Sequence, residues 1–99
     1  MDGTNPQGEA RKRSTLDIQM ELVKGANTPI SPTRLMYNCN VNYRTFHRLL
    51  NQCIACNFIS ILQKDPQDGR NRFKVQSTDL GKKSLNVYYQ LQTKARARL

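Results

Sequence analysis

The sequence predicts a mostly helical α+β fold, and three observations support this prediction. Apolar residues recur at helical spacing in successive segments, each preceded by a residue suited to begin a helix. Two β-prone runs, 58–64 and 72–76, flank the turn-forming segment 65–71. The chain has 99 residues, which is enough for one domain with a single modest core.

The first helix is expected from residue 14 to about residue 24. Ser14 and Asp17 have the spacing of a capping box, in which each side chain binds the other residue's backbone N–H. Gly25 can adopt the left-handed conformation that ends a helix. Residues 1–10 are rich in Gly, Asn, Pro and Gln and a basic cluster follows them, so 1–13 is expected to be a disordered basic arm.

A short second helix is expected at 32–37. Ser31 provides a hydroxyl at the N-cap, and Pro32 suits the first helical position because its missing N–H has no partner there. Leu35 is expected to point inward, and Tyr37 is expected to pack against the core. Ile30 is expected to add a short strand just before this helix.

The third expected helix is the most sharply amphipathic segment of the chain. A turn at 38–41 precedes it, Asn42 is its predicted N-cap, and it ends near residue 57. Helical spacing divides its side chains into two faces. The apolar face holds Phe46, Leu49, Leu50, Cys53 and Ile54, and the polar face holds Arg44, His47, Arg48 and Asn51.

The order of elements predicts a winged helix-turn-helix domain. Three helices and a β-hairpin come first, and Thr78 and Asp79 then open a last helix that can run to residue 99. A three-helix core plus a β-hairpin wing is the plan in which the third helix enters the DNA major groove. We therefore expect this domain at 14–78, followed by a long C-terminal dimerisation helix at 79–99.

The charge distribution favours an anionic partner. The formal net charge is +9, and no Asp or Glu occurs between Glu21 and Asp65. Nucleic acid, an anionic membrane surface and an acidic protein would all suit this bias.

No apolar run approaches the roughly 20 residues that span a bilayer, and the N-terminus has no signal-like stretch, so we expect a cytoplasmic, nucleoid-associated protein without membrane contact. An enzyme is not expected, because paired carboxylates, a nucleophile–base set and a phosphate-cradling loop are missing.

A spaced pattern runs through 35–43, 49–50, 57–59 and 77–82. It resembles the archaeal winged helix-turn-helix DNA-binding family that includes small dimeric chromatin-type proteins of Sulfolobus and related transcriptional regulators. The resemblance covers roughly residues 11 to 91. It implies double-stranded DNA binding, a role as transcriptional regulator or chromatin-associated factor, and pairing of the last helix with its copy in a second subunit.

Double-stranded DNA is therefore the expected partner, with the recognition helix at 43–56 in the major groove and the wing at 64–72 on the backbone. Arginine can bridge guanine O6 and N7 or clamp a phosphate, and asparagine can address adenine or the backbone. The alternative is a winged-helix protein-interaction module that docks on an acidic partner. The expected DNA-binding residues are Arg34, Asn42, Tyr43, Arg44, Thr45, His47, Arg48, Asn51, Lys64, Arg70, Asn71 and Arg72.

Some of these residues allow a second interpretation. Tyr43 could turn its hydroxyl toward a phosphate or pack against the core. Cys39, Cys53, Cys56 and His47 could supply four zinc ligands, but Cys39 and Cys53 fit better as small buried residues, and no cofactor or metal is expected.

The last helix is expected to mediate a homodimer. At about 1.5 Å per residue it would be ~30 Å long, more than a domain of this size can cover. An amphipathic helix that lies free is the alternative. The residues expected at the dimer interface are Leu80, Leu85, Val87, Tyr88, Leu91 and Ala95.

Overall fold

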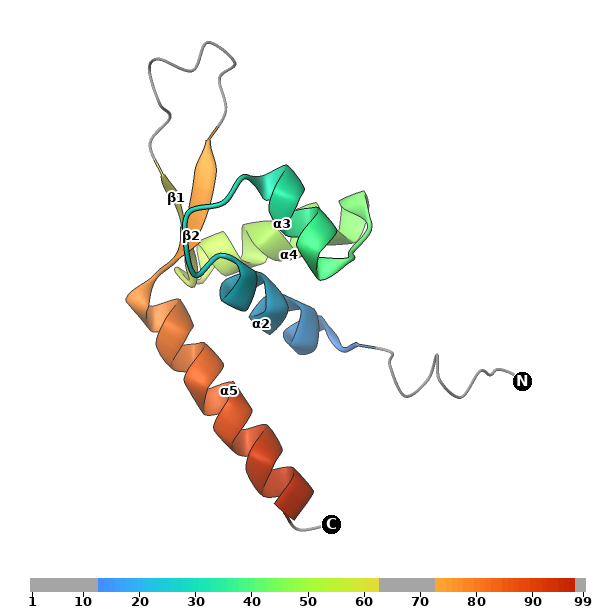
Figure 1. Cartoon of the computed structure of the whole chain (residues 1–99), viewed down its shortest axis with the longest axis vertical. Helices are drawn as coiled ribbons and strands as arrows, with labels where there is room; N and C mark the ends of the chain where they lie inside the picture. Colours follow the sequence, from blue (N-terminus) through green and yellow to red (C-terminus); the bar gives the residue numbers. More distant parts are fainter. Residues whose placement is uncertain (1–12, 63–72, 98–99) are drawn as a thin grey trace, which may run out of the picture.

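The structure, a computed structural model, describes residues 13–62 and 73–97, with side chains as far as residue 93. Three helices lie beside a two-stranded hairpin, and Figure 1 shows the last helix extending away from them. This order confirms the predicted winged helix-turn-helix architecture. The elements are α2 (Thr15–Gly25), α3 (Pro32–Cys39), α4 (Tyr43–Ala55), β1 (Ile59–Leu62), β2 (Lys74–Ser77) and α5 (Asp79–Ala97).

Polar side chains begin the helices as the sequence predicts. Ser14 Oγ accepts a hydrogen bond from the Asp17 N–H at 3.0 Å, and the Asp17 carboxylate accepts one from the Ser14 N–H at 3.0 Å. Ser31 is the N-cap of α3. The Asn42 side-chain oxygen accepts from the Thr45 N–H at 2.8 Å at the start of α4. Each cap satisfies backbone donors that have no partner inside the helix, so local chemistry sets these starts.

The helix ends follow the prediction only in part. Asn40 after α3 and Asn57 after α4 are left-handed, with φ of 54° and 64°, and asparagine tolerates this conformation. Gly25 was expected to end α2 in the same way, and that prediction is wrong because no described glycine has a positive φ. A Cβ at position 25 would lie 2.6 Å from Leu35 Cδ1. Gly25 therefore allows α2 and α3 to approach closely.

The hairpin is tied to the helices at its base. β1 and β2 pair antiparallel, with Ile59 opposite Ser77 and Leu62 opposite Lys74. The short strand expected at Ile30 is a single antiparallel bridge to Val75, with N···O distances of 3.0 and 2.9 Å. The connection between α2 and α3 is thereby fixed to β2.

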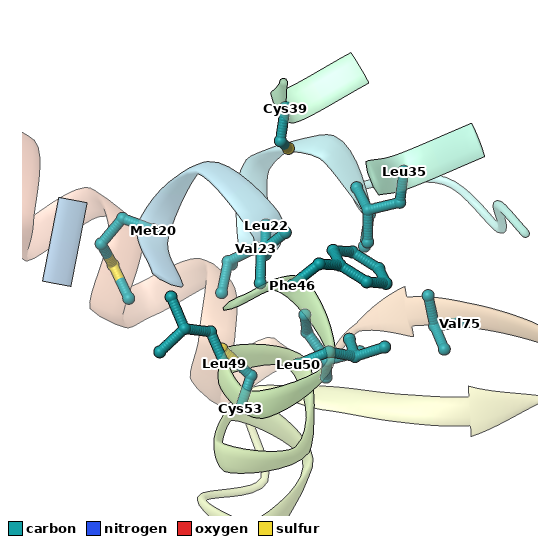
Figure 2. Packing of buried hydrophobic residues seen from close by; sticks show 12 residues of the cluster. Met20, Leu22, Val23, Leu35, Cys39, Phe46, Leu49, Leu50, Cys53 and Val75 are labelled. Carbon is teal, nitrogen blue, oxygen red and sulfur yellow. The ribbon is translucent and has the colours of Figure 1, made fainter. Parts of the chain in front are cut away.

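The core lies where α2, α3, α4 and the hairpin meet. Figure 2 shows the ring of Phe46 near Leu35 of α3 and Val75 of β2. Each large apolar side chain buried in this way contributes roughly 1.5–3 kcal/mol. The buried cluster consists of Met20, Leu22, Val23, Ala26, Leu35, Cys39, Phe46, Leu49, Leu50, Cys53, Ile59 and Val75.

A compact set of contacts joins α5 to the end of α4; we call Asn57, Phe58, Thr78 and Gly81 the α5 joint. Thr78 Oγ1 donates to the Asn57 carbonyl at 2.6 Å and accepts from the Gly81 N–H at 3.0 Å. The Thr78 N–H donates to the Phe58 carbonyl at 3.0 Å. A Cβ at position 81 would lie 2.1 Å from that carbonyl oxygen, so only glycine fits there.

Beyond the joint, α5 contacts α2. Leu85 and Tyr88 are partly buried against the core, and the Tyr88 hydroxyl donates to the Asp17 carboxylate. That hydrogen bond, with one from the Ser14 N–H, holds the pKa of Asp17 below its usual value. Burial and the bond to Asp17 raise the pKa of Tyr88 to about 12. The C-terminal half of α5 extends beyond the three-helix core (Figure 1).

Candidate nucleic-acid interface

The polar face of α4 is open to solvent. Arg44, Arg48 and Asn51 are all exposed, and they lie opposite the side on which Phe46 and Leu49 are buried. The buried residues of α4 all lie on its apolar side, and its exposed side carries mainly polar and cationic side chains, with the exposed Tyr43 ring at its N-terminal end. No Asp or Glu lies on α3 or α4.

The first turn of α4 is partly occupied by its own capping. The Asn42 side-chain oxygen is already bonded to the Thr45 N–H, so Asn42 keeps its amide N–H groups for a ligand. Thr45 is half-buried. Tyr43 is 70% exposed, which favours a hydroxyl that points toward a phosphate over packing against the core. His47 is half-buried, with its ring centroid 4.3 Å from that of Tyr43 in an edge-on arrangement.

α3 contributes a second set of side chains. Arg34 is exposed, as a phosphate contact requires. Tyr37 was expected to pack against the core, and this prediction is wrong because its side chain is 73% exposed. Leu35 and Cys39 are the buried residues of α3. Tyr37 follows Leu35 by two residues, which is about 200° around the helix and therefore on the opposite face.

These side chains border a cleft between α3, α4 and the start of β2. Its volume is about 800 Å³. We call it the aromatic cleft because Tyr37 of α3, Tyr43 of α4 and Phe73 beside β2 line it, together with Arg34 and His47. None of the described residues that line it is acidic. Arg34, Tyr43 and His47 were predicted from the sequence to lie on the interface, whereas Tyr37 and Phe73 were missed; the helical period could have found Tyr37.

The predicted wing contacts Lys64, Arg70, Asn71 and Arg72 lie outside the described residues. At the described base of the wing, Lys74 is exposed on β2. It adds a cation that was not predicted from the sequence.

The acidic side chains of the described domain are on α2 and α5, and none is on α3 or α4. Asp17 and Glu21 are on α2, and Asp79 begins α5.

Arg13 was predicted to belong to the basic arm, but its guanidinium is bonded to the folded domain. It donates to Glu21 at 2.6 Å and to the carbonyls of Cys39 and Asn40 at 2.8 and 3.0 Å. Arg13 therefore fixes the end of α3 to α2 and is not a free cation.

The cysteines follow the interpretation that the sequence favoured. Cys39 and Cys53 are buried, and Cys56 is exposed. Burial raises the pKa of the Cys53 thiol to about 11, which keeps it protonated at neutral pH. Within residues 13–62 and 73–93, no cluster of three or more His, Cys, Asp or Glu could hold a metal ion.

The residues expected at a dimer interface divide into two groups. Leu85 and Tyr88 lie against the domain's own core. Leu80, Val87 and Leu91 are exposed, Val87 by 53% and Leu91 by 63%. Ala95 is in α5, but its side chain lies outside the described part of the molecule.

Of the helices in the described part of the chain, none is long and apolar enough to cross a bilayer.

Solved structures of similar shape include a DNA-binding protein and a transcriptional regulator. Sso10a-2, a DNA-binding protein from Sulfolobus solfataricus, has a TM-score of 0.68 at 17% identity, covering 87% of this chain and 88% of its own. The PcaV transcriptional regulator from Streptomyces coelicolor has a TM-score of 0.66 at 18% identity, with coverage of 97% and 81%. Smu.1704 from Streptococcus mutans UA159 has a TM-score of 0.70 at 18% identity, with coverage of 84% and 82%.

Similarity at these identities establishes the fold alone. Among curated proteins there is no significant match. The profile of the winged helix-turn-helix family, however, matches residues 12–96, which is most of the chain. The chain belongs to the winged helix-turn-helix family.

Proposed function

We propose that this protein binds double-stranded DNA, with α4 in the major groove. The observation that carries the proposal is the outward face of α4: Arg44, Arg48 and Asn51 are exposed, and neither α3 nor α4 has a carboxylate. Arginine and asparagine are the side chains that pair bidentately with guanine and adenine edges. Phosphate contacts from Arg34 and from the wing residues Lys64, Arg70, Asn71 and Arg72 would supply affinity and orientation.

The role that we propose is transcriptional regulation or chromatin organisation, without catalysis. Sso10a-2 is a DNA-binding protein and PcaV a transcriptional regulator, and each is similar to this chain over more than four-fifths of its own length. A homodimer is part of the proposal, with the exposed residues Leu80, Val87 and Leu91 of α5 at its interface. Two copies would present two α4 helices to one duplex.

The decisive experiment is a titration of a random-sequence duplex with the double variant Arg44→Ala/Arg48→Ala. Each arginine contact is worth about 1–3 kcal/mol, so duplex affinity should fall by a factor of roughly 30 or more. The slope of log K against log salt should also become shallower by about one for each phosphate that is no longer neutralised. Fluorescence anisotropy at several salt concentrations measures both quantities.

Lys82→Ala/Lys83→Ala is the matched control, because both lysines are exposed on α5 and the change in net charge is the same. This control should lose much less affinity. Equal losses of affinity in the two variants would show that net charge alone attracts the DNA and would remove α4 from the interface. No binding of duplex by the parent protein, combined with binding of an acidic polypeptide, would favour the protein-interaction module instead.

A further inference from the structure

The aromatic cleft has properties that a duplex-reading surface does not require. Tyr37 and Tyr43 are 73% and 70% exposed, although large aromatic side chains usually bury most of their area. They stand on different helices and border the same hollow, with Phe73 at the hairpin side. Contiguous exposed apolar surface rimmed by polar groups marks a binding site more often than chance.

The cleft also has the charge of an anion-binding site. Arg34 and His47 both line it, and Arg34 is exposed. Among the described residues, the Arg34 guanidinium has no hydrogen bond or ion pair. Aromatic walls and a guanidinium, with no acidic side chain among the described lining residues, fit a planar ring that carries a phosphate.

A base in a duplex cannot use these aromatic walls. Both of its faces are covered by stacked neighbours, and only its edges and the phosphates are accessible. An unpaired base, in contrast, offers a free face that stacks on an aromatic side chain. The His47 ring packs edge-on against the Tyr43 ring, with 4.3 Å between the ring centroids. Tyr37 is therefore the aromatic ring with more free surface for a base to stack on.

We propose that the aromatic cleft binds one unpaired nucleotide of a DNA strand, with the base stacked on Tyr37 and a phosphate at Arg34. The site would let the protein bind single-stranded segments next to the duplex held by α4. This inference rests on the proposed function only for the choice of DNA as ligand. The cleft shares Arg34 with the proposed duplex interface, but stacking would depend on Tyr37 of α3, whereas duplex reading would depend on Arg44 and Arg48 of α4.

The test compares two strands of equal length, an oligothymidine and the same backbone with abasic sites. The parent protein should bind the oligothymidine about tenfold more tightly, because a strand without bases cannot stack. Tyr37→Phe keeps the ring and should retain this ratio. Tyr37→Leu removes the ring and should abolish it. Position 37 is largely exposed, so neither substitution should unfold the chain, and circular dichroism checks this.

Tyr89→Leu is the control, since Tyr89 is a partly exposed tyrosine on α5 outside the cleft, and it should retain the tenfold ratio. Equal affinity of the parent protein for the two strands would overturn the inference. So would an equal fall in affinity for Tyr37→Phe and Tyr37→Leu, which would assign the hydroxyl to a backbone phosphate. A parent protein that binds blunt duplex but not oligothymidine would refute the cleft site and leave the duplex proposal intact.

Discussion

α4 and α5 are both amphipathic, but the chain completes the packing of only one of them. The apolar face of α4 is largely covered, since Phe46, Leu49 and Cys53 are buried against α2, α3 and the hairpin. On α5, Leu85 is covered in part, while Val87 and Leu91 remain exposed. The difference indicates that the apolar side chains of α4 are buried within the monomer, whereas those at positions 87 and 91 of α5 are not.

The largest effect should separate a leucine on α4 from a leucine on α5. Leu49→Ala removes a fully buried side chain and should lower the free energy of unfolding by about 2–5 kcal/mol. Leu91→Ala makes the same chemical change at an exposed position and should cost the monomer less than about 0.5 kcal/mol. Denaturant unfolding at low protein concentration measures both. Similar costs would mean that the exposed stripe of α5 is packed within the monomer.

Gly81→Ala tests whether α5 is rigidly joined to the end of α4. The added Cβ would meet the Phe58 backbone oxygen at 2.1 Å, and a backbone atom in this position cannot move without disturbing the turn after α4. We expect a loss of about 2–3 kcal/mol in the free energy of unfolding, although alanine is the better helix former. Gln90→Ala, at an exposed position of the same helix, is the control. A stabilised Gly81→Ala variant would show that the joint is loose.

A smaller effect is expected from the contact between α5 and α2. Tyr88→Phe removes the hydrogen bond to Asp17 and should cost about 0.5–1 kcal/mol at neutral pH. The folded pKa of Asp17 lies below the ordinary value of 3.8, so its contribution is present above that pH and is lost as the pH falls through the folded value. The folded pKa of Tyr88 is about 12, so its contribution is present below the ordinary value of 10.0 and is lost as the pH rises toward 12.

Unfolding curves across this pH range provide the check. The parent protein should lose more stability than Tyr88→Phe at both the acid and the alkaline end. Tyr89→Phe is the control, because no hydrogen bond of its hydroxyl is found among the described residues. Parallel pH profiles for the parent and Tyr88→Phe would contradict the assignment.

The smallest effect on the free energy of unfolding, but a decisive one on association, should come from Val87→Lys/Leu91→Lys. Both positions are exposed, so the monomer should change by less than about 0.5 kcal/mol. The proposed dimer should dissociate, because four lysines would replace apolar area at its interface. Sedimentation velocity over a range of concentrations measures this.

The matched control for association is Asn86→Lys/Gln90→Lys, which adds the same charge at exposed polar positions of α5. It should remain a dimer. A parent protein that is monomeric at all concentrations would end the proposal of dimerisation through α5. A dimer that survives the double substitution at 87 and 91 would move the interface elsewhere.

The elements predicted from sequence are those that depend on neighbours in the chain. Ser14, Ser31 and Asn42 cap helices through atoms only three residues away, and the alternation of Phe46 and Leu49 with polar residues marks the buried side of α4. Such local signals do not require knowledge of the tertiary structure. For this reason the order of elements, and the position and buried side of α4, were predicted correctly.

The errors concern contacts between distant segments. Gly25 looked like a helix terminator, but its role is set by Leu35 on the next helix. The hydrogen bond from Tyr88 to Asp17 joins residues that are 71 positions apart in the sequence, and no sequence pattern predicts it. The error at Tyr37 has another cause. The helical period places Tyr37 opposite the buried Leu35 and so predicts an exposed side chain, whereas the prediction of burial relied on the general tendency of tyrosine to be buried. A short helix with one buried stripe leaves its other residues outside.

The α5 joint has a consequence for the spacing of DNA sites. Thr78 binds the Asn57 carbonyl and the Gly81 N–H, so the axis of α5 is set relative to the end of α4. In the proposed dimer, this angle would determine the distance between the two recognition helices and hence the half-site spacing, which must match about one helical turn of DNA. Two relatives could therefore read the same bases and still prefer different operators if their joints differ.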